Sequence, residues 1–280
     1  MEILAFVSIF ILLVFFVLMI NADVVKFVVF PLEQMFEKVQ ALSWNPMSVT
    51  KSMIDEDTTK KKEGSKEIHM IDKSVTKIAY LLVIGYGEAG TGIIIKNMGW
   101  TGTRVDIPGE KIIGIYGFCD IWNFTDATEV LQTKVMTFVN WIASIVHTNV
   151  VKFGGSPNKN IGDAFLFVWK LASLSEEPAF FAWMMRYLDG DSDEFSEEEA
   201  LAVSVIVDLS VYAILKIIAK INSYKQILAY REHKGLNERI KDYAVKMGFG
   251  LHLGWSIEGL IGSHHKVDAS YLSPHVGLAA

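Results

Sequence analysis

Residues 112–170 read IIGIYGFCDIWNFTDATEVLQTKVMTFVNWIASIVHTNVVKFGGSPNKNIGDAFLFVWK and decide the fold that the sequence predicts. An apolar run ends at Asp120, a helical stretch follows, and two more apolar runs come after it. The last of these runs begins directly after Asp163. Acids at the edges of paired strands can lie side by side, and two adjacent carboxylates suit a divalent metal ion held over a triphosphate.

The predicted order of elements from residue 112 onward is β-α-β-β-α-β, which is the ferredoxin-like unit. We therefore expect an α+β fold in this part of the chain. Residues 247–261 alternate with glycines and complete the order as a strand and hairpin. The strands are expected at residues 112–120, 150–153, 165–169 and 247–261, and the helices at residues 128–147 and 200–230.

The composition indicates a membrane-associated protein and gives no support for nucleic-acid binding. Hydrophobic residues make up 51% of the 280 residues, which is high for a purely soluble chain. The net charge is −6, whereas a nucleic-acid-binding surface is expected to be basic. The only cysteine, Cys119, excludes an internal disulfide, and its apolar neighbours favour a buried side chain over a catalytic thiol.

The N-terminus contains an apolar run long enough to span a bilayer. Residues 3–20 are apolar except for Ser8, which predicts a transmembrane helix within residues 1–22. A secretory signal peptide would need a basic segment before the run and a small-residue cleavage site, and neither is evident. The basic residues 60–62 follow the run, so the positive-inside rule places the rest of the chain in the cytoplasm. We expect a single span, or the last of several if the protein starts earlier.

Three segments lie between this run and the α+β domain. Residues 23–44 show helical periodicity and predict a juxtamembrane amphipathic helix, which either lies at the membrane or pairs two chains. Residues 45–77 are polar and predict a linker. The connector at residues 78–111 contains a G-x-G-x-x-G loop at residues 85–90, but the next strand follows too closely for a dinucleotide-binding fold. We expect one domain over residues 112–280, with an insertion at about residues 171–245.

Motifs in this domain resemble those of the class III adenylyl and guanylyl cyclase catalytic domains. Residues 118–125, FCDIWNFT, are similar to the family's F-x-D-I-x-x-F-T, and residues 159–165, KNIGDAF, to its K-T-I-G-D-A-F. Residues 250–254, GLHLG, and 259–263, GLIGS, resemble G-I-H-x-G and G-x-I-G-S. Residues 268–280 are similar to the segment that ends V-N-L-A-A. The motifs occur in the family's order, so the resemblance covers most of the domain outside the insertion.

The resemblance implies an enzyme that converts ATP to cyclic AMP and pyrophosphate with two Mg²⁺ or Mn²⁺ ions per site. The attacking and leaving oxygens would lie between the two metals, which need hard oxygen ligands. By resemblance, Asp120 and Asp163 hold both metals and the backbone carbonyl of Ile121 holds one. The phosphates would be bound by the backbone N–H groups of Asn123, Phe124 and Thr125.

The resemblance also suggests which base is bound. A lysine four residues before the second aspartate is typical of ATP-specific members, and Lys159 has that place; glutamate is usual in GTP-specific members. A lysine donates to adenine N1, whereas a glutamate would accept from guanine. Lys152 is a rival if residues 154–158 form an insertion, and the second base contact falls on Ser270. In the family the metal-binding acids and the lysine of one site come from different subunits, so we expect a homodimer, or a heterodimer with another cyclase domain.

Two departures from the family pattern put activity in question. The asparagine that orients the ribose would fall on Gly277, and the arginine that stabilises the transition state would lie beyond Ala280. We expect the domain to be truncated at its C-terminus. The leading hypothesis is thus a membrane-anchored adenylyl cyclase. The alternatives are a catalytically impaired cyclase-like structural or regulatory subunit of a larger assembly, and a guanylyl cyclase.

Overall fold

The computed structural model describes residues 2–33, 36–37, 70–71, 73–78, 80–81, 84–86, 90, 98–99, 102–103, 108–173, 175–190, 197–263 and 265–280. The chain divides into two compact units, Met1–Gly85 and Tyr86–Ala280. Most of the predicted linker at residues 45–77 lies outside the described residues, as does most of the glycine loop at residues 85–90.

The first unit begins with one long apolar helix. α1 spans Glu2–Val24 and continues through η1, a π-helical turn at Val25–Val29, to residue 33. Pro31 lies within this continuation, and its ring crowds the carbonyl of Phe27 four residues earlier, which the wider π turn accommodates. Residues 36–37 are also helical, and the remainder of the predicted juxtamembrane helix lies outside the described residues.

Two described helices have the length and composition of a membrane span, namely Phe6–Glu33 and Ala200–Ile221. None of the most apolar 18-residue stretch of the first helix is buried. This agrees with the expected apolar helix at the N-terminus. The number of spans and the cytoplasmic orientation stay predictions.

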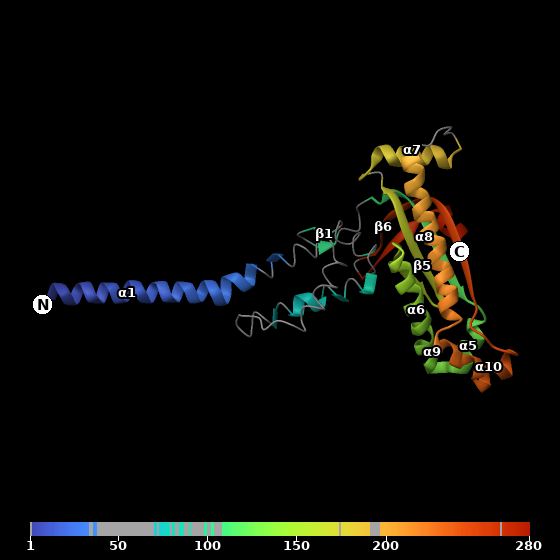
Figure 1. Ribbon diagram of the computed structural model, residues 1–280, viewed down its shortest axis with the longest axis horizontal. Coiled ribbons are helices and arrows are strands. Elements are labelled where there is room, and N and C mark those ends of the chain that lie inside the picture. Colours follow the sequence, from blue (N-terminus) through green and yellow to red (C-terminus); the bar gives the residue numbers. More distant parts are fainter. Residues whose placement is uncertain are drawn as a thin grey trace. The chain divides into compact units, whose positions relative to one another are not determined.

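The second unit is built on a five-stranded antiparallel sheet with the strand order β4-β5-β3-β6-β7 (Figure 1). β3 is the central strand, and its sequence is an almost continuous apolar run because its side chains are buried on both faces of the sheet. A separate two-stranded ladder joins β1 (Met98–Gly99) and β2 (Gly102–Thr103). The strands of the large sheet are β3 (Glu110–Ile121), β4 (Ser156–Ile161), β5 (Ala164–Ser173), β6 (Met247–Ser263) and β7 (Lys266–Leu272).

Helices cover one face of this sheet. Phe138, Ile142, Val146 and Val150 recur at four-residue spacing on α6 and are buried against alternate side chains of β3 and β5. α8 adds buried side chains to the same core, and Figure 1 shows both helices lying along the sheet. The helices are α5 (Phe124–Leu131), α6 (Val135–Lys152), α7 (Pro178–Leu188), α8 (Glu197–Ile221), α9 (Lys225–Leu228), α10 (Lys234–Arg239) and α11 (Pro274–Ala279), with 3₁₀ turns η2 (Gln132–Lys134) and η3 (Ala229–Glu232).

The predicted mixture of helices and antiparallel strands is confirmed, but two predicted elements are wrong. The strand expected at residues 150–153 does not exist, because Val150 completes the apolar face of α6 and the helix runs to Lys152. Gly154 then takes a positive φ of 77°, which ends the helix. The strand that follows is β4, at 156–161. The helix expected at residues 200–230 ends at Ile221, and the short helix α9 and turn η3 follow it.

The other face of the sheet is partly covered by the short helix α11. α11 lies close to β6, because a Cβ atom at Gly250 would be 2.0 Å from the backbone oxygen of Ala279, and one at Gly254 would be 2.3 Å from the ring of His275. The glycines of the GLHLG motif therefore make room for this helix. Ser273 caps it, since its hydroxyl accepts from the His275 N–H at 2.9 Å.

We predict that Gly250→Ala destabilises the domain by about 1–3 kcal/mol, because the added methyl group overlaps backbone that cannot rotate away. Gly277→Ala is the matched control. Gly277 also belongs to this contact region, but no described atom lies within 4 Å of its Cβ position. Replacing a helical glycine by alanine there should stabilise by about 0.5–1 kcal/mol. Urea unfolding of the two variants measures both effects, and equal stability would contradict the seating of α11 on β6.

Candidate active site

A tight hairpin turn positions Asp163. Ile161 on β4 pairs with Ala164 on β5, which leaves Gly162 and Asp163 as a two-residue turn. Gly162 has a φ of 66°, a positive value that such turns favour at their first position and that other residues adopt at a cost. The glycine of the NIGDA sequence thus fixes the direction in which the chain turns, and the aspartate follows at the edge of the sheet.

Asp120 reaches the same place from the end of β3. Cys119 pairs with Phe165, so the next residues along the two strands bring Asp120 beside the turn that contains Asp163. Burial raises the pKa of the Asp163 carboxyl above its ordinary value, a backbone hydrogen bond lowers it, and the hydrogen bond and negative charge of Asp120 raise it again. The two carboxylates predicted to share metal ions are therefore brought together.

A helix N-terminus lies directly after Asp120. Ile121 is buried at the end of β3, and Asn123 takes the left-handed conformation, with φ 56° and ψ 35°, at the N-cap of α5. The first N–H groups of a helix have no partner within the helix, and a left-handed residue before them widens the concave set of donors. This arrangement fits the predicted role of Asn123, Phe124 and Thr125 in phosphate binding.

The acidic side chains of α5 form ion pairs with an arginine of α10. Arg239 of α10 forms ion pairs with Asp126, at 3.1 Å, and with Glu129. Asp126 lies in the first turn of α5, where an unpaired carboxylate would repel a phosphate. The Arg239 guanidinium reduces that repulsion, although exposure to solvent keeps the effect small.

The two predicted base contacts meet in the structure. Lys159 on β4 donates a hydrogen bond from its ammonium to the Ser270 hydroxyl on β7, across 111 positions of sequence. Lys152, the alternative, lies in the last turn of α6 and not on β4. Residues 153–155 connect α6 to β4, which begins at Ser156.

The structure adds two features near these residues that the sequence did not indicate. Asn158, beside Lys159, has buried amide atoms with no hydrogen-bond partner among the described residues. It sits at a bulge where β4 shifts register against β5. No sequence pattern identifies such an amide, because its burial follows from the pairing of β4.

The second feature is a buried polar network that holds β7 next to Ser270. The Tyr271 hydroxyl donates to Glu258 at 2.9 Å, and Lys170 lies 3.4 Å from the same carboxylate. Glu258 is only 8% exposed, and a buried carboxylate needs partners of this kind. Burial raises the pKa of Tyr271 well above its ordinary value, and the charge of Glu258 adds to this. The network therefore links β7 to β6 and β5 beside Ser270.

Gly277 lies on the exposed side of α11. The structure thus places it on the helix that follows β7, where the family's ribose-orienting asparagine was expected. Since a Cβ atom there would have no described atom within 4 Å, packing does not require a glycine.

The oxygen ligands available here suit Mg²⁺ or Mn²⁺ better than they suit a metal ion whose ligands all come from the protein. Among the described residues there is no group of three or more His, Cys, Asp or Glu side chains that could hold a metal ion. Asp120, Asp163 and the Ile121 carbonyl supply two carboxylates and one backbone oxygen. Mg²⁺ typically takes one or two carboxylates and completes its shell with water and substrate phosphates. The residues present therefore fit a metal that arrives with a nucleotide.

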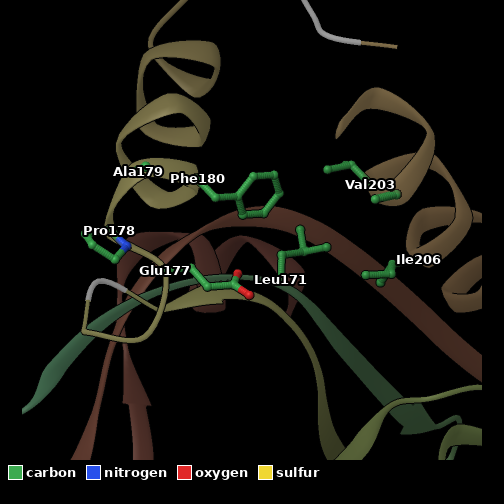
Figure 2. Close-up of a pocket in the computed structure, with 8 residues that line it drawn as sticks. Leu171, Glu177, Pro178, Ala179, Phe180, Val203 and Ile206 are labelled. Carbon is green, nitrogen blue, oxygen red and sulfur yellow. The ribbon is translucent and has the colours of Figure 1, made fainter. Parts of the chain in front are cut away.

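A cavity of about 540 Å³ lies between α7 and α8, away from these residues. Figure 2 shows Phe180 of α7 pointing toward Val203 and Ile206 of α8, with Leu171 of β5 beneath them. Leu171 is near the end of β5 opposite Asp163. The cavity is therefore not part of the candidate site.

Comparison with known proteins gives one match to a family model and several to solved structures. The sequence model of the RasGEFs all helical domain matches residues 1–99, a segment that ends before β3. No curated protein matches the chain.

Several solved structures are similar to the chain. A bacterial light-regulated adenylyl cyclase has 22% sequence identity and a TM-score of 0.49, over 76% of this chain and 50% of that one. The adenylyl cyclase CyaB from P. aeruginosa has 17% identity and a TM-score of 0.39, over 62% and 71%. The guanylate cyclase domain of RhGC from Catenaria anguillulae, in complex with GTP, has 19% identity and a TM-score of 0.39, over 61% and 71%. The chain spans half the length of the light-regulated enzyme, and likeness at this level does not identify an activity.

We predict that Asp163→Asn raises the melting temperature of the metal-free protein at neutral pH. When folding raises the pKa of a carboxyl group, that group destabilises the folded protein at any pH above its folded pKa. At a pH below its unfolded pKa the group is protonated in both states, and the destabilisation disappears. The gain should therefore shrink as the pH falls into the acidic range. Asp126→Asn is the control, because it removes a partner of Arg239 and should not stabilise. Thermal unfolding across pH values, with chelator present, makes the comparison; a gain that grows toward acid pH would contradict it.

Proposed function

We propose that this chain is a membrane-anchored nucleotidyl cyclase, with a cytoplasmic catalytic domain, that converts ATP to cyclic AMP and pyrophosphate. The observation that supports this most is the meeting of Asp120 with Asp163 beside the N-terminus of α5. Two carboxylates next to unpaired N–H groups form a place for a metal-bound triphosphate. The hydrogen bond between Lys159 and Ser270 adds a second polar pair, suited to the edge of a base.

In the proposed reaction the 3′ hydroxyl of ATP gives its proton to water as its oxygen attacks the α-phosphorus, the bond from that phosphorus to the bridging oxygen breaks, and pyrophosphate leaves. Two Mg²⁺ or Mn²⁺ ions, when bound, supply Lewis-acid stabilisation of the attacking and leaving oxygens. Asp120, Asp163 and the Ile121 carbonyl hold the metals. The backbone N–H groups of Asn123, Phe124 and Thr125 bind and orient the phosphates.

The proposed enzyme works as a dimer because each chain supplies two separate halves of a site. Lys159 lies on β4, opposite Leu166 of β5, whereas Asp163 lies in the turn that follows β4. The metal half of one chain and the base half of another would then enclose one nucleotide. The second chain is either an identical copy or another cyclase domain, and membrane anchoring raises the concentration at which the two meet.

The proposed base is adenine. The Lys159 ammonium donates a hydrogen bond, which suits adenine N1, and the Ser270 hydroxyl can accept from the exocyclic amine. A lysine cannot accept from the N1–H of guanine, so the guanylyl cyclase alternative is less well supported. Both side chains already lie within hydrogen-bonding distance of each other, so little rearrangement is needed to present them to a base.

The test is formation of cyclic AMP by the full chain in membranes or a membrane mimic, with Mn²⁺ and ATP. Asp163→Asn should lower the rate by more than about 100-fold, since loss of even an outer-shell metal partner costs about 10–100-fold. Asp126→Asn is the matched control and should keep most of the activity. Cyclic GMP from GTP in place of cyclic AMP would overturn the choice of base.

A second candidate function, a non-catalytic cyclase-like subunit of a larger assembly, is favoured by Gly277. A glycine at this position has no side chain to orient a ribose. Since the space beside it is open, Gly277→Asn is expected to fold normally. If the chain is an enzyme, this variant should raise kcat by about tenfold or more, because the asparagine side chain adds a hydrogen-bond donor in the transition state. Gly277→Ala is the control and should leave kcat unchanged. ATP binding without turnover in the native chain and in Gly277→Asn would establish the non-catalytic function instead.

A further inference from the structure

α8 exposes an apolar stripe on the side that faces away from the sheet. We call this stripe the outer face of α8; its apolar side chains are 41–64% exposed and are Leu201, Val205, Val211, Tyr212, Leu215 and Ile218. On the opposite side of the helix, Ala213, Ile217 and Ile221 are buried in the domain core. The Phe153 ring packs edge-on against Tyr212, with the ring centres 4.9 Å apart, and the six side chains otherwise stay exposed in the described part of the chain.

The bilayer is not the cover that the stripe requires. Ala200–Ile221 has the length and hydropathy of a span, but one side of this helix is packed in the core of the domain. Moving α8 into a membrane would remove Ala213 and Ile217 from the core that they share with α6 and β5. The helix therefore stays in the domain, and a partner would contact only its outer face.

The spacing of the outer face is that of a coiled-coil seam. Positions 201, 205, 208, 212 and 215 alternate in steps of four and three residues, as the a and d positions of heptads do. Position 208 is an aspartate, so one acid interrupts an otherwise apolar seam. Lys216 lies beside this seam, with its ammonium 5.1 Å from the centre of the Tyr212 ring.

We propose that the outer face of α8 pairs with the same face of a second copy of this chain, with the two helices antiparallel. In an antiparallel pair centred on Ser210, Asp208 of each copy faces Tyr212 of the other, next to the Lys216 ammonium. The same alignment places Val205 opposite Leu215. In a parallel pair the two Asp208 carboxylates would face each other at the seam, which like charges oppose. A single polar seam residue commonly fixes alignment in this way.

This pairing is independent of the proposed cyclase activity. α8 packs on the helix-covered face of the sheet, and Asp120 lies on the other face, since it alternates with Cys119, which is in the helix-side core. The pairing therefore leaves the candidate site free to take part in a separate contact. It is also self-complementary, as contacts about a two-fold axis must be.

Disulfide cross-linking of the full chain in a membrane mimic tests the pairing and its direction. The variant Val205→Cys/Leu215→Cys should form a cross-linked dimer under mild oxidation. Val205→Cys alone and Leu215→Cys alone should not, because identical positions of the antiparallel pair lie about 15 Å apart along the helices. The native chain is a further control, since its only cysteine, Cys119, is buried. Cross-linking by either single variant, or no cross-link with both cysteines, would overturn the proposal.

Charge exchange provides a second test on the same cysteine pair. Asp208→Lys should reduce cross-linking by about tenfold, because it places two cations against each other, and Lys216→Asp should do the same with two anions. The combined exchange should restore cross-linking. Both side chains are exposed, so unchanged thermal unfolding is expected to show that all three variants fold. Equal cross-linking in all of them would refute the antiparallel alignment.

Discussion

The register of β3 between its two neighbours is the constraint on which the rest of the domain depends. β3 pairs with β6 over all twelve of its residues and with β5 from Ile112 to Cys119. A shift of one residue would turn every side chain of the strand to the opposite face. Asp120 would then point into the apolar core, and Cys119 would replace it beside the turn that holds Asp163. The apolar side chains on the helix side therefore fix the position of the acid at the strand end.

The two faces of the sheet have different chemistry because different partners cover them. On one face, α6 and α8 exclude water from aliphatic and aromatic side chains, and this core supplies most of the burial. On the other face, buried polar groups are satisfied in pairs, such as Tyr116 with Ser256 at 2.5 Å and Tyr271 with Glu258. Buried polar pairs require a defined geometry to remain favourable. That requirement makes this face rigid where β7 and α11 must be held near the candidate site.

The sequence predicted the parts of the site that local patterns determine. The apolar run before Asp120 and the glycine before Asp163 are local signals for a strand end and a turn, and both acids lie where these signals place them. β4 was misplaced because its sequence, SPNKNI, is polar and becomes a strand only by pairing with β5. The contact between Lys159 and Ser270 joins distant parts of the chain. Only the family resemblance had assigned both residues to one base, and no periodicity could have done so.

Gly277 differs from the glycines that folding requires, because packing does not restrict the side chain at this position. Gly250 and Gly254 are required by packing, since larger side chains would collide with α11, and selection for folding alone would preserve them. At residue 277 the surrounding space is open, so folding imposes almost no restriction on the side chain. Natural variation among relatives at this position would therefore reflect gain or loss of catalytic activity. Variation at the two packed glycines would instead reflect changes in how the helix packs on the sheet.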